Sequence, residues 1–286
     1  MSGGIGRGTG VPPVNLEMDA KHGRDARATM VCSTVAEWRT LRSSPEWAGG
    51  TIGFVPTMGA LHAGHESLLA RARAENERVV LSIFVNPTQF NDPGDLAKYP
   101  RTLGADLALA ERYVDAVIAP PREEFYPDDY RYRITETDLS RRLEGAHRPG
   151  HFEGVLTIVL KLLNVVQPTR AYFGEKDWQQ LQLVRGMAAA FFLPVEIVPC
   201  ATVREPSGLA MSSRNTRLSP AGRAHAARFS RALRDARDAA AATAQLRADG
   251  FEVDYVEDVA GVRLGAVRTE GVRLIDNCRL TPANPT

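Results

Sequence analysis

Two histidines, His62 and His65, lie three residues apart at a point where the sequence pattern changes. They belong to the stretch FVPTMGALHAGHESLLARAR (54–73), which begins as a strand-like run and continues with leucine and alanine at helical spacing. The N-terminus of a helix presents unpaired N–H groups and about half a positive charge. Gly59 and Gly64 allow the backbone to approach a ligand closely. The combination predicts a site that holds the phosphates of a nucleotide and stabilises the charge that develops during group transfer.

Other common signatures of nucleotide and metal sites are absent from the sequence. No GxxxxGK[ST] motif occurs, so the site is not a P-loop. His65-Glu66 is not followed by the second histidine of a HExxH metalloprotease. The alternating glycines of the first ten residues do not fit GxGxxG and follow no predicted strand. The three cysteines are scattered singly, which offers no zinc site and suits a reducing compartment.

Three further polar stretches follow predicted strands or flank flexible residues. Asn86 and Gln89 lie in NPTQF, directly after the apolar run VVLSIFV, and an amide can both donate and accept. Gly174–Asp177 follows a short strand and places an ammonium and carboxylates near a helix start. Met211–Arg214 offers two hydroxyls and a guanidinium between turn-forming residues. Taken alone, each stretch fits an ordinary loop or helix cap as well as a site.

The elements that position these groups alternate along the chain. Helical spacing is found over 34–41, 66–75, 103–112, 152–166 and 178–192. Strand-like runs occupy 51–55, 79–85, 116–119, 171–173 and 195–198. Repetition of strand and helix with short links predicts an α/β fold with a Rossmann-like, doubly wound and mostly parallel sheet. Ligands of such sheets bind beyond the carboxyl ends of the strands, where the polar stretches lie.

The two ends of the chain differ from this pattern. Residues 1–30 are rich in glycine and polar residues, so we expect a disordered extension, with Met30 as a second possible start. After about residue 203 we expect a smaller α+β domain. It begins with a helical stretch from Ser219-Pro220 to about Ala248, followed by short strands near 253–256, 266–268 and 272–275. The predicted domains are therefore 31–203 and 204–286.

Length and composition limit the class of protein. The chain has 286 residues, of which 44% are hydrophobic and 24% charged, values ordinary for a soluble globular protein. A net charge of +1 gives no field that would favour nucleic acid or a membrane surface. No apolar run reaches the roughly 18 residues needed to span a bilayer.

The motif HAGH has the form HxGH, which resembles the nucleotide-binding signature of the nucleotidylyl transferase superfamily and of class I aminoacyl-tRNA synthetases. Around it, FVPTMGALHAGHESLL, SIFVNPTQF, YPRTL, RPGHFEGVLTIVLKLLNVVQP, YFGEKDWQQL and MSSRN occur in this order. This series closely resembles the pantoate–β-alanine ligase family. The resemblance is dense from residue 31 to 215 and thins to a final RLIDN.

The resemblance implies an enzyme that condenses (R)-pantoate with β-alanine, using ATP and Mg²⁺. A pantoyl adenylate forms first, and AMP and pyrophosphate are released. The implied partners are thus small molecules, with no nucleic acid and no membrane. A homodimer is expected from the family alone, and a cytoplasmic location also agrees with the sparse cysteines.

The resemblance also carries over roles residue by residue. His65 matches the family's proton donor, and His62 and Lys176 are the other candidate catalytic residues. The implied ATP-binding residues are Met58, Gly59, Ala60, Leu61, His62, Gly64, His65, Gly174, Glu175, Lys176, Asp177, Val203, Met211, Ser212, Ser213 and Arg214. The implied pantoate and β-alanine contacts are Gln89, Asn86 and Gln180.

Several roles remain open at the level of the sequence. His65 can act as a general acid or only as a donor to phosphate oxygen, and we favour the second role because Mg²⁺-bound pyrophosphate hardly needs a proton to leave. Asp177 can cap a helix, or orient ribose or Mg²⁺. Arg148–His151 (RPGH) is interpreted mainly as a helix entry. The part after residue 215 looks shorter than the family norm, which would make the lid over ATP smaller.

Two alternative functions are considered. The first is another HxGH nucleotidylyl transferase with a different acceptor, against which NPTQF and Gln180 argue. The second is a non-catalytic RNA-binding relative of the synthetases. It would use the arginine-rich stretch 214–237 as a basic face, although that spacing also fits a solvated amphipathic helix.

Overall fold

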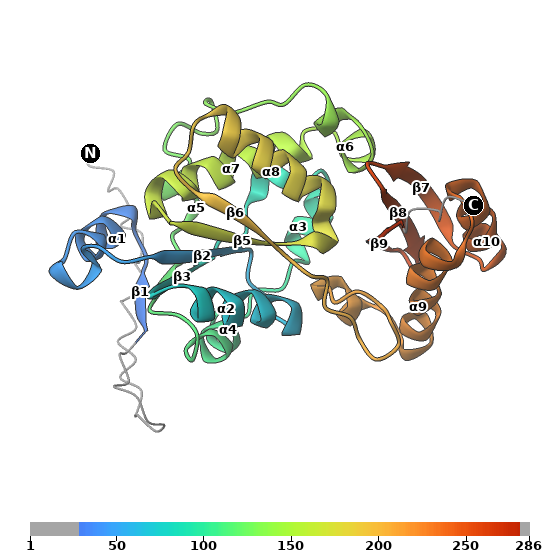
Figure 1. The fold of residues 1–286 in the computed structure, drawn as a ribbon, viewed down its shortest axis with the longest axis horizontal. Coiled ribbons are helices and arrows are strands. Elements are labelled where there is room, and N and C mark those ends of the chain that lie inside the picture. The colour runs from blue at the N-terminus through green and yellow to red at the C-terminus, as the bar shows by residue number, and fades with distance from the viewer. Residues whose placement is uncertain (1–28, 281–286) are drawn as a thin grey trace, which may run out of the picture.

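The computed structural model describes residues 29–280, which form two sheets with their helices (Figure 1). The strands are β1 (Met30–Cys32), β2 (Ile52–Thr57), β3 (Arg78–Ile83), β4 (Ala116–Ile118), β5 (Arg170–Gly174), β6 (Glu196–Cys200), β7 (Glu252–Val259), β8 (Val262–Thr269) and β9 (Val272–Arg279). The α-helices are α1 (Val35–Arg42), α2 (Ala63–Glu75), α3 (Pro93–Ala97), α4 (Leu103–Ala110), α5 (Arg122–Phe125), α6 (Glu144–His147), α7 (His151–Val166), α8 (Trp178–Ala190), α9 (Pro220–Asp235) and α10 (Ala239–Ala248). Short 3₁₀ turns are η1 (Pro45–Trp47), η2 (Pro87–Gln89), η3 (Leu139–Arg141), η4 (Glu175–Asp177) and η5 (Ser213–Arg217).

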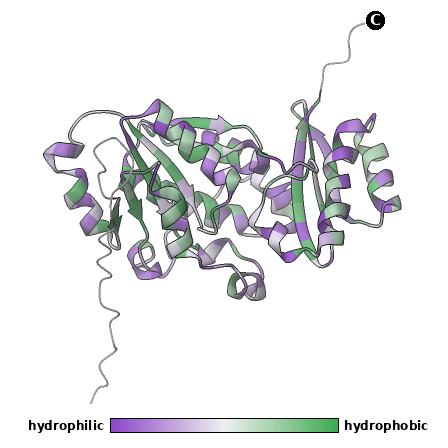
Figure 2. Ribbon diagram, turned by 90° about the horizontal axis from the view of Figure 1, so that it is seen from below, coloured by the Kyte–Doolittle hydropathy of each residue, from purple (hydrophilic) through white to green (hydrophobic). Residues whose placement is uncertain are grey.

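The larger sheet is six-stranded and parallel throughout, in the order β1-β4-β3-β2-β5-β6. Its central strands are buried on both faces, which explains why the runs over 52–55 and 79–83 are nearly continuously apolar, with Ser82 as the one polar side chain. Figure 2 shows this band of hydrophobic strands between helices whose outer faces are polar. The predicted Rossmann-like, doubly wound sheet is confirmed.

Two helical layers cover the two faces of this sheet. Phe54, Val80 and Phe173 point to one face, where they pack with α1, α7 and α8. The neighbouring residues on the same strands point to the other face, where they pack with α2 and α4. This alternation with period two fixes the register of each strand, because a slip of one residue would exchange the faces.

The C-terminal unit consists of α9, α10 and the antiparallel sheet β7-β8-β9. Its turns, Ala260-Gly261 and Glu270-Gly271, have positive φ at both residues, as tight hairpins of type I′ require. The three strands are eight residues each, longer than the predicted fragments. The predicted single helical stretch is wrong, because Asp238 caps a separate helix by accepting from the N–H of Ala241 at 2.7 Å.

The C-terminal unit contacts the larger one through apolar and charged groups. Leu143 packs with Val262 and Leu264 of β8. Beside them, the Arg273 guanidinium donates to both oxygens of Glu144 at 2.6 and 2.7 Å. A buried, bidentate ion pair thus joins β9 to α6.

At the N-terminal end the predicted boundary of the disordered extension is wrong by one residue. Met30 starts β1, which pairs in parallel with β4 and is therefore part of the sheet. The rest of the predicted extension, apart from Thr29, lies outside the described residues. Within residues 29–280, no helix combines the length and apolar character needed to cross a membrane.

Candidate active site

The candidate site lies where the order of the parallel sheet reverses. From β2 the chain adds β3 and β4 on one side, and β5 and β6 on the other, so the switch point lies between β2 and β5. The carboxyl ends of these neighbouring strands lead directly into the HxGH turn and into Gly174–Asp177. A doubly wound sheet binds its ligands at this place. The topology therefore brings together two stretches more than 100 residues apart in the sequence.

The two histidines form the N-terminal cap of α2. His62 is the N-cap residue, and its Nδ1 accepts from the N–H of Gly64 at 3.1 Å. In return, the Nδ1 of His65 accepts from the N–H of His62 at 3.3 Å. Serine or threonine and glutamate usually fill such a reciprocal capping box. Imidazoles in both roles close the helix end and leave each Nε2 for another task.

The hydrogen bonds determine the protonation of both rings. A backbone N–H can donate only to a nitrogen that carries no proton, so each neutral imidazole has its proton on Nε2. Burial, then the charges of His62 and Lys176, lower the pKa of His65 to about 3. Burial, followed by Lys176, also lowers the pKa of His62. Both rings are therefore neutral at pH 7 and offer Nε2–H donors.

The turn before His62 is held by Asp106, which sequence reasoning missed. This buried carboxylate of α4 accepts from the N–H of Ala60 at 3.0 Å and of Leu61 at 2.7 Å. Thr102 adds a hydroxyl donor at 3.1 Å. Ala60 has a positive φ of 51°, so its backbone is held in a conformation that alanine rarely adopts. Asp106 thus fixes the turn that delivers both histidines.

A cavity of about 250 Å³ opens at this edge of the sheet. Most of the predicted site residues line it: Met58, His62, Gly64, His65, Asn86, Gln89, Gly174, Lys176, Asp177, Gln180, Val203, Met211, Ser212, Ser213 and Arg214. Gly59, Ala60, Leu61 and Glu175 are not in its wall. The N–H groups of the first three are bound to Thr57 and Asp106, so these residues shape the turn.

Gln89 and Asn86 act as a pair in the loop after β3. The side chain Nδ2 of Asn86 donates to Oε1 of Gln89 at 3.1 Å and to the carbonyl of Gly154 at 3.1 Å. The Nε2 of Gln89 donates to Met58 Sδ at 3.1 Å. Its amide is therefore oriented with the oxygen toward Asn86 and the NH₂ toward Met58. One N–H of that NH₂ group points elsewhere and can serve a ligand.

The stretch Gly174–Asp177 divides its side chains between the cavity and the C-terminal unit. Lys176 lies in the cavity wall, with its Nζ 3.8 Å from Asp177. Glu175 instead accepts from Arg279 at 2.7 Å. Asn277 donates to the carbonyls of Glu175 and Lys176, both at 2.9 Å. The asparagine of the RLIDN motif therefore fixes the backbone that carries the lysine, a role that the motif alone did not reveal.

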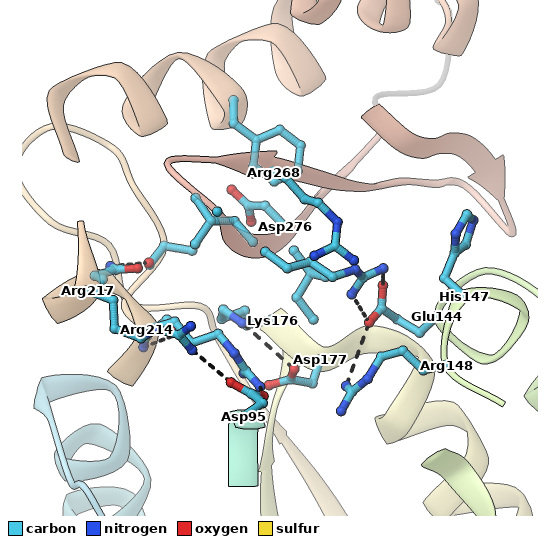
Figure 3. A pocket seen from close by; sticks show the side chains of 18 of the residues that line it. Asp95, Glu144, His147, Arg148, Lys176, Asp177, Arg214, Arg217, Arg268 and Asp276 are labelled. Carbon is cyan, nitrogen blue, oxygen red and sulfur yellow. Dashed lines mark hydrogen bonds and ion pairs between the residues drawn. The ribbon is translucent and has the colours of Figure 1, made fainter. Parts of the chain in front are cut away.

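The loop with Met211–Arg214 also lines the cavity, and Met211 lies beside Gly64 of the HxGH turn. The N–H of Met211 donates to the carbonyl of Val203 at 2.9 Å, and Ser212 caps η5. Arg214 and Arg217 both donate to Asp95 of α3, at 3.0 and 2.8 Å (Figure 3). A carboxylate thus holds in place two guanidinium groups that could otherwise meet phosphate.

A second cavity of about 280 Å³ adjoins the first on the side of the C-terminal unit (Figure 3). The two cavities share five wall residues, namely Arg148, Lys176, Asp177, Ser212 and Arg214. Charged side chains of both signs surround the second cavity, and Glu144 connects to Arg148 and Arg273 there. The two cavities thus make one cleft between the large sheet and the C-terminal unit.

Known proteins carry this combination of fold and site. The family model described as Pantoate-beta-alanine ligase matches residues 30–279. A protein named pantothenate synthetase from Bdellovibrio bacteriovorus is 55% identical over 253 residues, which are 88% of this chain and all of that protein. The chain belongs to the pantoate–β-alanine ligase family.

Solved structures of the family agree with this assignment. The pantothenate synthetase of Thermus thermophilus superposes with a TM-score of 0.82 at 45% identity, covering 89% of this chain and all of that one. The pantoate–β-alanine ligase of Francisella tularensis, solved with β,γ-ATP and β-alanine, also gives 0.82, at 39% identity, with 88% and 98% covered. The predicted activity, a pantoate–β-alanine ligase, is confirmed, and neither alternative function is supported.

The comparison also corrects one expectation about length. The match covers the whole of the Bdellovibrio protein and of the Thermus chain, so the C-terminal part is not shortened relative to these ligases. The region looked incomplete because the lengths of its strands were underestimated from the sequence. In the structure, β7, β8 and β9 form a three-stranded sheet.

Proposed function

We propose that this ligase condenses (R)-pantoate with β-alanine through an enzyme-bound pantoyl adenylate. The pantoate carboxylate attacks the α-phosphorus of ATP, and pyrophosphate leaves. The amine of β-alanine then attacks the acyl carbon, loses a proton and displaces AMP. Adenylation supplies a good leaving group on a carboxylate that otherwise lacks one. The protein's task is to position the reactants and to stabilise charge.

The observation that carries this proposal is that His62, His65 and Lys176 meet at the switch point, in the wall of the cavity that Gln89 also lines. Two neutral Nε2–H donors and an ammonium suit the oxygens of a triphosphate. An apolar wall suits the aliphatic part of pantoate, and consists of Phe84, Val155, Ile158, Val159, Leu162 and Phe173. Gln89 and Gln180 supply amides for its hydroxyl and carboxylate groups.

For His65 we propose a hydrogen-bonding role and not that of a general acid. An imidazole with a pKa near 3 carries no spare proton at pH 7. Its Nε2–H can instead donate to the phosphate oxygens throughout the displacement, where charge builds up. His62 makes the same kind of contact from the N-cap position. Among the ATP contacts, Gly59, Ala60, Leu61 and Glu175 act through the backbone and shape of the site.

Mg²⁺ is proposed to enter with ATP. Within residues 29–280 there is no cluster of three side chains that could hold a metal ion by themselves. Asp177 offers one carboxylate at the cavity wall, which fits an ion that prefers substrate phosphates, water and one or two carboxylates. When bound, the ion neutralises charge on the departing pyrophosphate.

The roles of the two domains and the oligomeric state are also proposals. Residues 31–203 hold the nucleotide and pantoate, and residues 204–286 form a lid over ATP. A homodimer is proposed from the family expectation, and a cytoplasmic location also suits the three unpaired cysteines, which fit a reducing compartment. Sedimentation of a species with twice the chain mass of 31.2 kDa would support the dimer, and a monomer at micromolar concentration would refute it.

The test measures pyrophosphate release from ATP with pantoate, with β-alanine and with both. We expect release to require pantoate, and we expect free AMP and pantothenate to accumulate only when β-alanine is also present. Release that is indifferent to pantoate would refute the proposal, and a different acceptor would have to be sought.

A further inference from the structure

His151 is buried at the first position of α7, and it makes hydrogen bonds through both ring nitrogens. Its Nδ1 lies 2.8 Å from the backbone carbonyl of Gln89, and its Nε2 lies 3.1 Å from Nη1 of Arg148. A carbonyl only accepts and a guanidinium only donates, so the proton is on Nδ1. The ring therefore donates to Gln89 and accepts from Arg148.

Arg148 supports the same arrangement from the other side. Its Nη2 donates to the Gln89 carbonyl at 3.3 Å, so one carbonyl receives both side chains. Glu144 lies 4.0 Å away on α6 and partly neutralises the guanidinium. Burial, and next the charge of Arg148, lower the pKa of His151 to about 3, which keeps the ring neutral and its acceptor free.

Gly154 brings the helix close enough for this contact. A side chain at residue 154 would meet the carbonyl oxygen of Thr88 at 2.5 Å and the nitrogen of Gln89 at 2.8 Å. Helix α7 thus lies directly against the backbone of η2, and His151 reaches the end of that turn. The Gln89 side chain that leaves the same backbone lines the cavity.

We propose that His151 is a positioning residue for the ligase reaction, which holds the Gln89 backbone so that its amide faces pantoate. Arg148 fixes the tautomer that this task requires. The inference rests on the proposed contact between Gln89 and pantoate. It does not require His151 to touch any substrate.

Three substitutions of similar size test the role of the Nδ1–H group. Asn places an amide N–H near the position of Nδ1, Gln places it near Nε2, and Leu has no donor. We expect His151→Leu and His151→Gln to raise the KM for pantoate about tenfold, the loss of one hydrogen bond worth about 1.4 kcal/mol. His151→Asn should stay within about threefold of the wild type. The KM for ATP should change less than twofold in all three variants.

The pattern separates positioning from simple structural support. Equal impairment by Asn and Leu, a parallel rise in both KM values, or an unchanged KM for pantoate would each overturn the inference. If His151→Leu does not fold, the comparison of Asn with Gln decides alone, because both retain a polar amide. Failure of the proposed function would be detected separately, in the assay of the wild type, as pyrophosphate release that does not require pantoate. That result would also refute the inference about His151.

Discussion

At the scale of single residues, the site depends on imidazoles that stay neutral. His65 uses Nδ1 to close the helix cap and keeps Nε2–H for the cavity, so protonation would break the cap before it helped catalysis. Burial is the main cause of the lowered pKa of both histidines, and the charge of Lys176 adds to it. Neutral Nε2–H donors thus line the cavity together with the basic side chains of Lys176, Arg148 and Arg214.

Removal of the His65 donor should affect the rate far more than the fold. We expect His65→Ala to lower kcat for adenylation about 10² to 10³-fold, the usual effect of losing one donor to developing charge. The loss of its capping contact should cost only about 1 kcal/mol. Glu66→Ala is the matched control, because the next residue of α2 faces Arg112 and Tyr113 outside the cavity. A similar drop in kcat for both variants would contradict the assigned role.

The depressed pKa of His65 makes stability depend on pH in a defined direction. Below pH 6.5 the unfolded chain binds a proton at this residue that the folded chain does not bind until about pH 3. Acidification therefore destabilises the wild type by up to about 1.4 kcal/mol per pH unit from this group. The stability advantage over His65→Gln should shrink by about 2 kcal/mol between pH 7 and pH 5, as measured by urea unfolding. An advantage that is constant over this range would show that His65 is not buried in its neutral form.

At the scale of elements, close contacts between backbone segments set the geometry. Gly154 of α7 touches the backbone of η2, and Asp106 of α4 binds the turn before α2. Neither residue contributes a side chain to the proposed reaction. Gly154 positions the loop that carries Gln89, and Asp106 positions the turn that leads into His62 and His65.

Gly154→Ala should displace the loop that carries Gln89. The new methyl group would lie 2.5 Å from the Thr88 carbonyl oxygen, which cannot move without its turn. We expect the free energy of unfolding to fall by about 1–3 kcal/mol and the KM for pantoate to rise. Gly186→Ala in α8 is the matched control, since nothing lies within 4 Å, and it should be neutral or stabilising by up to about 1 kcal/mol. Equal behaviour of the two variants would refute the contact.

Asp106→Asn should loosen the turn that precedes His62. The amide keeps one acceptor but turns an NH₂ group toward a backbone N–H, so one of the two donors loses its partner. We expect the free energy of unfolding to fall by about 1–3 kcal/mol, and calorimetry to show weaker binding of an ATP analogue. Asp129→Asn on the surface should change stability by less than about 0.5 kcal/mol. Unchanged nucleotide affinity in Asp106→Asn would contradict its role.

The sequence predicted those elements and residues whose signals are local. The apolar run 79–85 predicted a strand covered on both faces, and HAGH predicted a helix start that lies in the cavity wall. The hairpin turns Ala260-Gly261 and Glu270-Gly271 went unrecognised, because alanine and glutamate seldom adopt positive φ and gave no turn signal. Asp106 also gave no signal, since its partners lie 45 and 46 residues away and meet it only in the folded chain.

At the scale of the whole molecule, two units enclose one cleft. The C-terminal unit is tied to the larger one by the pair Glu144–Arg273 and by Asn277, which donates to the backbone carbonyl of Lys176. Both contacts involve or adjoin residues that line the cleft, namely Glu144, Arg273 and Lys176. The hydrogen bonds that hold the C-terminal unit in place therefore also position residues that line the cleft.

Breaking the Glu144–Arg273 pair should weaken the association of the two units. Arg273→Leu leaves the buried Glu144 carboxylate with only the more distant guanidinium of Arg148, 4.0 Å away, and should lower the free energy of unfolding by about 3–5 kcal/mol and raise the KM for ATP. The double variant Glu144→Leu/Arg273→Leu should recover part of the stability, because the buried Glu144 carboxylate is gone, while Arg148 and Asp254 each lose one partner. Additive losses in the denaturant unfolding of the double variant would show that the two side chains act independently.

The most direct measurement of the central claim is a crystal structure with a non-hydrolysable ATP analogue and pantoate. We expect the phosphates at the N-terminus of α2, within hydrogen-bond distance of Nε2 of His62 and His65 and near Lys176. Pantoate should lie between the nucleotide and the amide of Gln89. A triphosphate bound elsewhere in the cleft, with both imidazoles free of it, would contradict the account.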